Sequence, residues 1–507
     1  MTIGRRTIAI REPQRFLLLS IVIGISAGLL VVCFHIAIES AAWLTFERGP
    51  LARFLSPAAG ALLGILLVTY VFRHARGSGV TDTKAAVYIS DGYVPPSAIA
   101  GKFLACSVSI GFGNPLGPED PSLHMGAGVA SWLGRLFRLN RDRMRLIAPV
   151  GAAAGIAAAF NTPITGVLFV IEEIVAGWNA GVLGSIMLAS VSATVVVRWF
   201  LGDQPLFLVP EFRLTHPSEL AVHAFVGLVG GLLAVGFVKL AAKLRRQLGR
   251  LKGRARLAAP VGAGILVGVA GIWLPQVLGA GYGTIDGALH HRFPWNVLLV
   301  LAVTKAALTL ICFSARTPGG MFAPTLFAGA MIGGGIGGLA EIYWPFPTSP
   351  SSAYVLVGMG TFFAGVFRAP MTSIFMIFEV SASYVIILPV MIANTIAYLI
   401  SRQMQPTPFF TQLAADEGLE LPSTEQQREA PRLLVENAMS PAGQETRIPD
   451  GAHVHPDLPL EAALPLLASQ AVVPVVTRVR PYRLVGTLTL EDVHRAYGIK
   501  GAARDAE

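Results

Sequence analysis

Long apolar stretches, separated by short polar or glycine-rich segments, cover most of this chain. The longer stretches have the length of helices that cross about 30 Å of hydrocarbon. They fall near residues 16–38, 54–72, 145–171, 183–201, 219–242, 257–278, 296–313, 353–378 and 384–400. Two more, near 97–112 and 321–339, are short or broken by glycine. The pattern predicts an all-α polytopic membrane protein whose broken, re-entrant helices expose backbone amides around a cavity.

The pattern occurs twice, with corresponding positions about 203 residues apart. The matching segments are Gly24, Gly28 and Phe34 with Gly227, Gly231 and Phe237; 77–79 with 279–281; 121–127 with 324–330; and 163–172 with 370–379. Four ordered matches at a nearly constant offset indicate a duplication. Duplicated halves are common in membrane proteins that carry a solute across the bilayer, so transport is the first hypothesis.

Charge placement indicates how the two halves are oriented. Residues 39–48 carry two acids and one base, whereas their counterpart at 243–256 carries seven bases and no acid. The positive-inside rule places the basic loop in the cytoplasm and the equivalent loop on the other side. We therefore expect inverted repeats in the cell membrane, with both termini cytoplasmic. The net charge of +9 then reflects anionic lipid contact and not nucleic-acid binding, because the bases flank membrane segments.

Glycine- or proline-bearing loops precede three of the apolar segments, at residues 77–82, 117–121 and 319–324. Each is typical of a helix N-terminus, where unpaired N–H groups and the peptide dipoles attract anions. Ser78 adds a hydroxyl donor. A single loop of this kind is usually a tight turn. Three together, two of them in register across the repeat, indicate a site that binds an anion weakly enough to release it.

In order and spacing these loops resemble the signature sequences G-S-G-I-P, G-[RK]-E-G-P and G-x-F-x-P of the CLC family of chloride channels and chloride/proton antiporters. The resemblance covers about residues 15–413. It implies an inverted-repeat CLC-like fold and a homodimer with one anion pathway per subunit. It further implies a gate at Glu119, proton transfer by Glu173, and an anion site formed by Ser78, Gly79, Met321, Phe322 and Phe410.

Two of these roles also have a physical argument or an alternative. A carboxylate at a helix N-terminus competes with an anion while ionised and withdraws once protonated, so Glu119 links proton and anion occupancy. In the resembled family, antiporters usually possess the glutamate at position 173 and channels usually lack it. The alternative for Glu172 and Glu173 is that they cap a helix as solvated charges, and Glu379, the repeat counterpart of Glu172, favours a structural role for Glu172.

The chain departs from the family pattern at several site positions. Pro118 and Asp120 flank Glu119 in place of a basic residue and a glycine, so a second carboxyl is available to share protons with the gate or to raise its pKa. Phe410 aligns with a tyrosine that donates its hydroxyl to the anion, and Thr81 replaces a proline. His124, five residues after the gate, is a second candidate for tuning it. The retained Ser78 argues against the family's fluoride-specific branch.

The sequence predicts three regions. Residues 1–413 form the transmembrane domain, with repeats at about 15–205 and 218–413; 414–431 form a polar linker; and 432–507 form a small α/β cytoplasmic unit. Its order of helix, strand, strand and helix resembles a single CBS motif, with strands near 472–477 and 482–488. Such motifs work in pairs, so we expect one from each subunit. The resemblance implies adenine-nucleotide contacts at Thr489 and Asp492; a ligand-free dimerisation module is the alternative.

The function predicted from these features is transport of chloride or a similar small anion in exchange for protons. A passive channel is the main alternative. An intramembrane hydrolase using Ser78 lacks a partner base, and the Gly333, Gly335 and Gly338 pattern lies in an apolar run without the βαβ unit of a dinucleotide site. No cofactor is expected to be required, and the three cysteines and scattered histidines have no metal-ligand spacing.

Overall fold

In the computed structural model the chain forms two compact units, and the boundary in the sequence lies between residues 425 and 426. It describes residues 12–175, 180–210, 214–423, 425, 433–441, 452–478 and 482–498. The basic N-terminal residues 5, 6 and 11 and residues 424 and 426–431 of the predicted linker lie outside this set. The first unit extends to Glu425, whose carboxylate lies 2.9 Å from Arg368, so it includes the start of the segment predicted as a linker.

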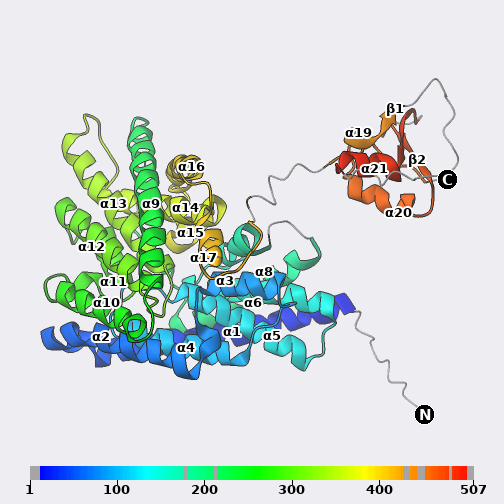
Figure 1. Ribbon diagram of the computed structural model, residues 1–507. Helices are drawn as coiled ribbons and strands as arrows, with labels where there is room; N and C mark the ends of the chain where they lie inside the picture. Colours follow the sequence, from blue (N-terminus) through cyan, green and yellow to red (C-terminus); the bar gives the residue numbers. More distant parts are fainter. Residues whose placement is uncertain are drawn as a thin grey trace, which may run out of the picture. The chain divides into compact units, whose positions relative to one another are not determined.

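The first unit consists of two sets of helices that follow one another in the same order (Figure 1). The first set is α1 (Glu12–Leu44), η1 (Phe46–Arg48), α2 (Pro50–Leu66), η2 (Leu67–Val71), η3 (Arg73–Ala75), α3 (Gly79–Tyr88), α4 (Pro96–Gly111), α5 (Glu119–Leu136), α6 (Arg141–Phe160), α7 (Pro163–Phe169), η4 (Val170–Val175) and α8 (Ala180–Leu201). The second set is α9 (Glu219–Gly249), α10 (Arg254–Trp273), η5 (Pro275–Val277), α11 (Tyr282–Leu289), α12 (Trp295–Ser314), α13 (Phe322–Tyr343), α14 (Ser351–Phe367), α15 (Pro370–Ser381) and α16 (Ile387–Met404), followed by α17 (Phe409–Asp416).

The helix breaks differ from the prediction in an informative way. The apolar stretches 145–171 and 353–378 are each two helices, because Asn161 and Arg368 adopt left-handed φ angles of 59° and 56°. The next helix then begins at Pro163 or Pro370, where the missing N–H costs nothing. Conversely, α13 is continuous over 22 residues although its glycines had suggested a break. Burial against α14 on one side compensates for their low helix propensity.

The repeated glycines lie where helices of the same half cross. A Cβ atom on Gly24 of α1 would lie 2.3 Å from the carbonyl oxygen of Ala189 in α8. Its counterpart on Gly227 of α9 would lie 2.7 Å from that of Ala393 in α16. Only a residue without a side chain permits this approach, so the duplicated pattern records a duplicated packing contact.

The two halves contact one another through paired, reciprocal hydrogen bonds. Gly117 and Gly320 each donate an amide N–H to the other's carbonyl oxygen at 2.8 Å. The carboxylate of Glu172 accepts the Thr372 amide at the start of α15 at 2.8 Å, and that of Glu379 accepts the Thr165 amide at the start of α7 at 2.7 Å. Reciprocal contacts of this kind are expected when a two-fold axis relates the two halves. Glu172 therefore caps a helix, as its repeat counterpart suggested, although it is buried and not solvated.

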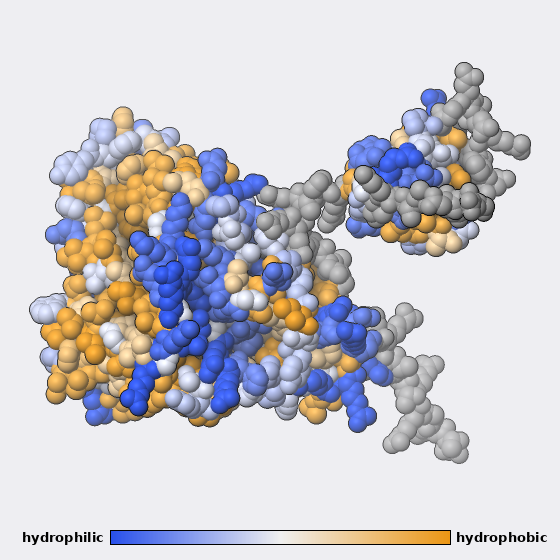
Figure 2. Space-filling model, viewed as in Figure 1, coloured by the Kyte–Doolittle hydropathy of each residue, from blue (hydrophilic) through white to orange (hydrophobic). Residues whose placement is uncertain are grey.

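Within the described residues, eight helices are long and apolar enough to cross a membrane. Their outward side chains include large hydrophobic residues such as Trp199 and Val303, which are 83% and 71% exposed. Figure 2 shows hydrophobic residues spread widely over this unit and interrupted by a hydrophilic band near α9. A surface of this kind is stable in lipid and not in water, so the first unit is a multi-span membrane protein.

The second unit is a small sheet with short helices. Its strands β1 (Ser440–Pro441), β2 (Val472–Val476) and β3 (Leu484–Thr489) are antiparallel in the order β1-β3-β2. Its helices are α19 (Val435–Ala438), η6 (Leu460–Ala463), α20 (Leu464–Leu467) and α21 (Leu490–Ala496). Val473, Val475 and Leu488 are fully buried in its core. The predicted strands and final helix are confirmed, whereas the CBS assignment stays a prediction.

Candidate functional site

The N-terminus of α3 holds a negatively charged side chain. Asp120, in the first turn of α5, accepts hydrogen bonds from the Ser78 hydroxyl and the Val80 amide at Oδ1 and from the Gly79 amide at Oδ2, each at 2.9 Å. Ser78 and Asp120 are 5% and 3% exposed. The Gly-Ser-Gly loop thus forms the anion-attracting helix end that the sequence predicted. The hydrogen bonds that this end donates are accepted by a carboxylate of the same chain.

Glu119, the adjacent residue, points to a different helix end. Its carboxylate is fully buried and accepts the Ala323 amide in the first turn of α13 at 3.2 Å. The hydroxyl of Tyr282, the first residue of α11, donates to its other oxygen. Successive helical residues point about 100° apart, which is how neighbouring carboxylates reach α13 and α3 separately. The three predicted loops therefore meet in the fold.

The predicted anion-binding residues gather around a cavity of only about 10 Å³. Its lining consists of Ser78, Asp120, Met321, Phe322 and Phe410 together with Phe313, Phe367 and Phe409. Met321 precedes α13 and Phe322 begins it, as predicted. The ring of Phe410 stacks on that of Phe367, with centroids 5.2 Å apart. The Phe410 position therefore faces Ser78 with a phenyl ring that has no donor.

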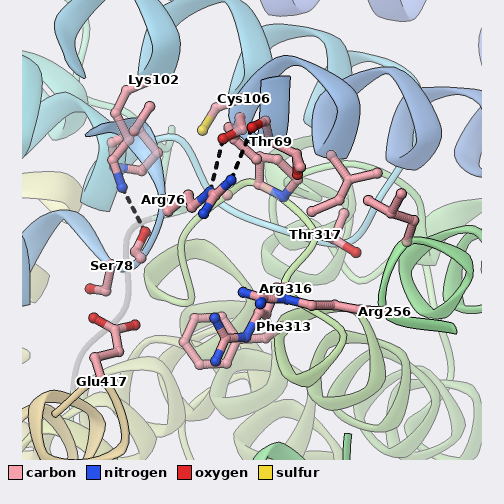
Figure 3. A pocket seen from close by; sticks show the side chains of 18 of the residues that line it. Thr69, Arg76, Ser78, Lys102, Cys106, Arg256, Phe313, Arg316, Thr317 and Glu417 are labelled. Carbon is pink, nitrogen blue, oxygen red and sulfur yellow. Dashed lines mark hydrogen bonds between the residues drawn. The ribbon is translucent and has the colours of Figure 1, made fainter. Parts of the chain in front are cut away.

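A much larger cavity, of about 430 Å³, also reaches Ser78 (Figure 3). Asp120 lines this cavity as well. Five arginines and a lysine line it: Arg76, Arg245, Arg254, Arg256, Arg316 and Lys102. The acidic side chains on its wall are Asp120 and Glu417. The cavity therefore carries an excess of positive charge beside the α3 N-terminus, which favours small anions there.

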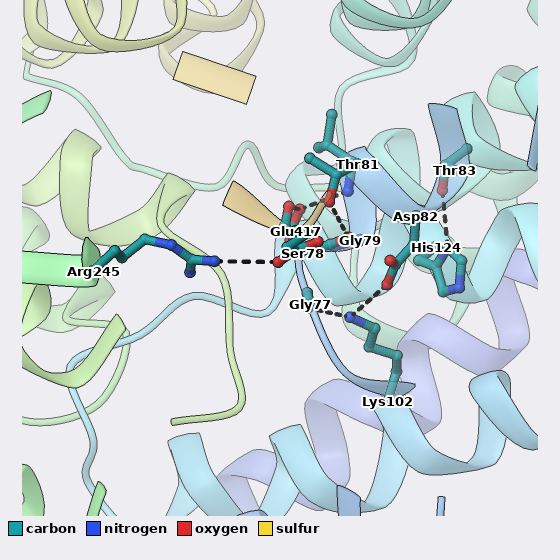
Figure 4. A network of polar contacts seen from close by, with 12 residues as sticks. Gly77, Ser78, Gly79, Thr81, Asp82, Thr83, Lys102, His124, Arg245 and Glu417 are labelled. Atoms are coloured by element: carbon teal, nitrogen blue, oxygen red, sulfur yellow. Dashed lines mark hydrogen bonds and ion pairs between the residues drawn. The ribbon is translucent and has the colours of Figure 1, made fainter. Parts of the chain in front are cut away.

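Polar contacts fix the loop that carries Ser78 (Figure 4). The Lys102 ammonium donates to the Gly77 carbonyl oxygen at 2.6 Å and lies 3.3 Å from the Asp82 carboxylate. On the other side, Arg245 lies 3.2 Å from Glu417. His124 forms a 3.0 Å hydrogen bond with Thr83 of α3. Its predicted tuning role would therefore act through α3.

Glu173 lies in η4 and is 6% exposed. The Lys84 ammonium, at 1% exposure on α3, donates to its Oε1 at 2.8 Å. Glu173 is therefore an internal, paired charge and not the solvated helix cap that was the alternative. Lys84 lies in the middle of α3 and Ser78 immediately before its first residue, so one short helix connects the Glu173 ion pair to the Ser78 loop.

Sequence reasoning missed Tyr282, Lys84 and Lys102. A signal existed for Tyr282, because it directly follows residues 279–281, the repeat counterpart of the 77–79 loop. For the lysines the signal was their charge inside apolar sequence, since buried ammonium groups are rare unless paired. Their partners could not be identified, because the chain separates Lys84 from Glu173 by 89 positions.

In the second unit, Thr489 and Asp492 bond to one another. The Asp492 carboxylate accepts the Thr489 amide at 3.0 Å and its hydroxyl at 2.6 Å, while the Asp492 amide donates to the Thr489 hydroxyl oxygen. Burial raises the pKa of Asp492, but hydrogen bonds from Thr489 and Ser440 outweigh it and hold that pKa below its usual value. The pair caps α21; nucleotide contact there stays a prediction.

Comparison with known proteins agrees with this architecture. Residues 59–402 match the family model described as voltage gated chloride channel. The chain is 31% identical over 378 residues to a putative chloride channel protein ClcB-like from Ralstonia nicotianae, covering 73% of this chain and 88% of that protein. It is 30% identical over 422 residues to an H(+)/Cl(-) exchange transporter ClcA from Vibrio cholerae, covering 80% and 90%.

Solved structures share the fold. A slow cyanobacterial Cl-/H+ antiporter superposes with a TM-score of 0.72 at 23% identity, over 80% of this chain and 97% of that one. A CLC-type fluoride/proton antiporter superposes with a TM-score of 0.66 at 21% identity, over 77% and 96%. The family match, the curated relatives and the repeat architecture agree, and they exclude the enzyme alternative. The chain belongs to the CLC family of anion channels and transporters.

Proposed function

We propose that this protein exchanges chloride or a similar small anion for protons. The observation that carries the proposal is the position of Glu119, whose buried carboxylate accepts the Ala323 amide at the N-terminus of α13. A carboxylate held there competes with an anion for the same partial positive charge. Protonation removes that competition, so Glu119 links proton occupancy to anion occupancy.

The second half of the proposal concerns proton supply. Glu173 is buried and paired with Lys84, so it provides an internal carboxylate away from the anion-binding loops. Buried carboxylates inside membrane proteins commonly serve as proton relays. The exchange activity named for the Vibrio cholerae relative supports the same assignment. Chloride is the proposed substrate, and no cofactor takes part.

Reconstitution into proteoliposomes tests the proposal. An outward chloride gradient should drive protons uphill in the wild-type protein, measured with a trapped pH dye. Glu173→Gln should abolish proton movement while chloride efflux continues, and Glu119→Gln should abolish proton movement together with the pH dependence of chloride flux. Chloride flux without uphill proton movement in the wild type would contradict exchange.

A passive, pH-gated chloride channel is the second candidate. The specific observation in its favour is the phenyl ring of Phe410 at the small cavity, because a site with fewer donors holds its anion less tightly. The Ralstonia nicotianae relative is described as a putative channel. Under this alternative, chloride in the proteoliposome assay moves down its own electrochemical gradient and drives no uphill proton movement. Glu173→Gln then leaves the chloride flux unchanged.

We further propose a homodimer with one pathway per subunit, both termini in the cytoplasm, and pairing of the two tails as CBS-like motifs. The family resemblance and the basic 243–256 segment support these points. Cross-linking of single-cysteine variants in native membranes tests the dimer and the tail contact. Titration of the full-length protein with ATP tests nucleotide binding, and Thr489→Ala should weaken it if that site exists.

A further inference from the structure

Asp120 has no part in the exchange scheme above, yet its carboxylate accepts three hydrogen bonds beside the proposed anion site. Its two carboxylate oxygens accept the Ser78 hydroxyl and the amides of Gly79 and Val80, all at 2.9 Å. These donors are the ones that a small anion would use at the N-terminus of α3. The side chain therefore occupies the position of a bound anion.

The space beside this carboxylate leads to the same conclusion. The cavity enclosed by Ser78, Asp120 and Phe410 measures only about 10 Å³. A cavity needs about 10–15 Å³ by this kind of measure to hold one water molecule. Chloride is larger than water, so an anion enters here only after the Asp120 carboxylate has left.

The backbone at Asp120 cannot supply that movement. A Cβ atom on Gly79 would lie 2.1 Å from the Asp120 carbonyl oxygen, and one on Gly320 would lie 2.6 Å from the Asp120 Cβ. The residue is thus clamped between two glycines of different loops. Rotation of the side chain remains available, because Asp120 also lines the cavity of about 430 Å³, which has room for a carboxylate.

We propose that Asp120 is a tethered competitor, whose carboxylate fills the anion position at α3 and must be displaced into the larger cavity before an anion binds at Ser78. The inference rests on the anion site of the proposed function but not on proton coupling. Binding to a site that is free for only a fraction of the time weakens the apparent affinity by that fraction. The Asp120 carboxylate therefore lowers the apparent affinity of the Ser78 site for anions.

The test compares chloride dependence of transport in proteoliposomes containing wild-type protein, Asp120→Asn or Asp120→Gly. The glycine variant should lower the KM for chloride by about tenfold or more, and the nearly isosteric asparagine variant should give an intermediate value. An unchanged or raised KM in variants that elute like the wild type on size exclusion would overturn the proposal. If the glycine variant fails to fold, the asparagine variant decides.

Glu417→Gln is the matched control. It removes one negative charge from the wall of the same large cavity without vacating the three donors at α3. If Asp120 acted only by repelling anions through space, both substitutions would lower the KM by similar factors, and the proposal would be wrong. Direct competition predicts a clearly smaller effect for Glu417→Gln.

Anomalous diffraction from crystals soaked in bromide supplies a second measurement. At a bromide concentration that leaves the wild-type α3 site empty, Asp120→Gly should show a peak beside the Ser78 hydroxyl. No peak in either protein, or equal peaks in both, would refute displacement. A wild-type protein that moves chloride without protons would contradict the exchange proposal alone and leave this test intact.

Discussion

Lys84 and Glu173 form an internal ion pair between α3 and η4, with the ammonium 2.8 Å from the carboxylate. Both side chains are almost completely buried. The electrostatic attraction within such a pair largely offsets the free-energy cost of removing two charges from water. Loss of one partner therefore leaves an expensive buried charge, whereas loss of both does not.

Lys84→Gln should lower the free energy of unfolding by about 3–5 kcal/mol, because it strands the Glu173 carboxylate. The double variant Lys84→Gln with Glu173→Gln should recover most of that loss. Denaturant unfolding in detergent micelles measures both. Additive effects of the two single substitutions would show that the residues do not interact energetically.

The sequence predicted the glycine loops and the duplicated halves, because motifs and repeats can be recognised in the chain itself. The meeting of Ser78, Met321 and Phe410 was implied by the family resemblance. The sequence did not predict which helix end each acidic side chain reaches. Glu119 and Asp120 are adjacent in the chain, yet their carboxylates point to α13 and α3. That outcome depends on contacts between segments 41 to 204 positions apart, which no local pattern encodes.

The helix breaks illustrate the same limit. Prolines at 163 and 370 were visible in the sequence, but an uninterrupted apolar stretch still favoured single spans there. Left-handed residues at Asn161 and Arg368 turn the chain so that Glu379 and Glu172 can cap the helices that follow. The caps come from the opposite half, so tertiary contacts decide where these helices begin.

Phe410→Tyr should tighten anion binding at the Ser78 site. A tyrosine hydroxyl would extend from a ring that already lines the small cavity, and one further hydrogen bond is worth about 0.5–1.5 kcal/mol, or up to about tenfold in affinity. Chloride titration by calorimetry measures the change. It should be largest in the Asp120→Gly background, where the site is vacant.

The reverse result, with the larger effect of Phe410→Tyr in the wild-type background, would indicate a different role for the hydroxyl. If Phe410→Tyr improves chloride binding in the wild type but not in Asp120→Gly, the hydroxyl must act by drawing the Asp120 carboxylate away and not by contacting the anion. If it weakens binding in both proteins, the hydroxyl is sterically excluded from the cavity.

Gly126→Ala should destabilise the membrane unit. The added Cβ would lie 2.2 Å from the carbonyl oxygen of Gly151, so α5 and α6 would have to separate. We expect a loss of about 1–3 kcal/mol, as for other overpacked interiors. Because α5 begins with the two site carboxylates, chloride flux should fall as well. Thermal unfolding and proteoliposome flux measure the two effects.

Gly236→Ala is the matched control for that substitution. Gly236 also lies inside a long helix, α9, but a Cβ there would meet nothing within 4 Å. Alanine should then be neutral or stabilising by up to about 1 kcal/mol, since it has the higher helix propensity. Equal losses at both positions would mean that helix propensity and lipid contacts, and not close packing, dominate.

Asp492 gives the second unit a defined dependence on pH. Its folded-state pKa lies below the usual value because hydrogen bonds from Thr489 and Ser440 outweigh burial. A depressed carboxyl pKa adds stability that is complete above the unfolded-state value of about 3.9 and is lost as the pH falls through the folded-state value. Protection of residues 482–498 from hydrogen exchange, measured in the full-length protein and corrected for intrinsic rates, should therefore decrease below about pH 4.

Two variants of the same helical turn test this capping role. Asp492→Asn should lose protection already at pH 7 and should show a weaker dependence of protection on pH. Glu491→Gln removes an exposed charge and should change neither the protection nor its pH dependence, so equal behaviour of the two variants would contradict the capping role.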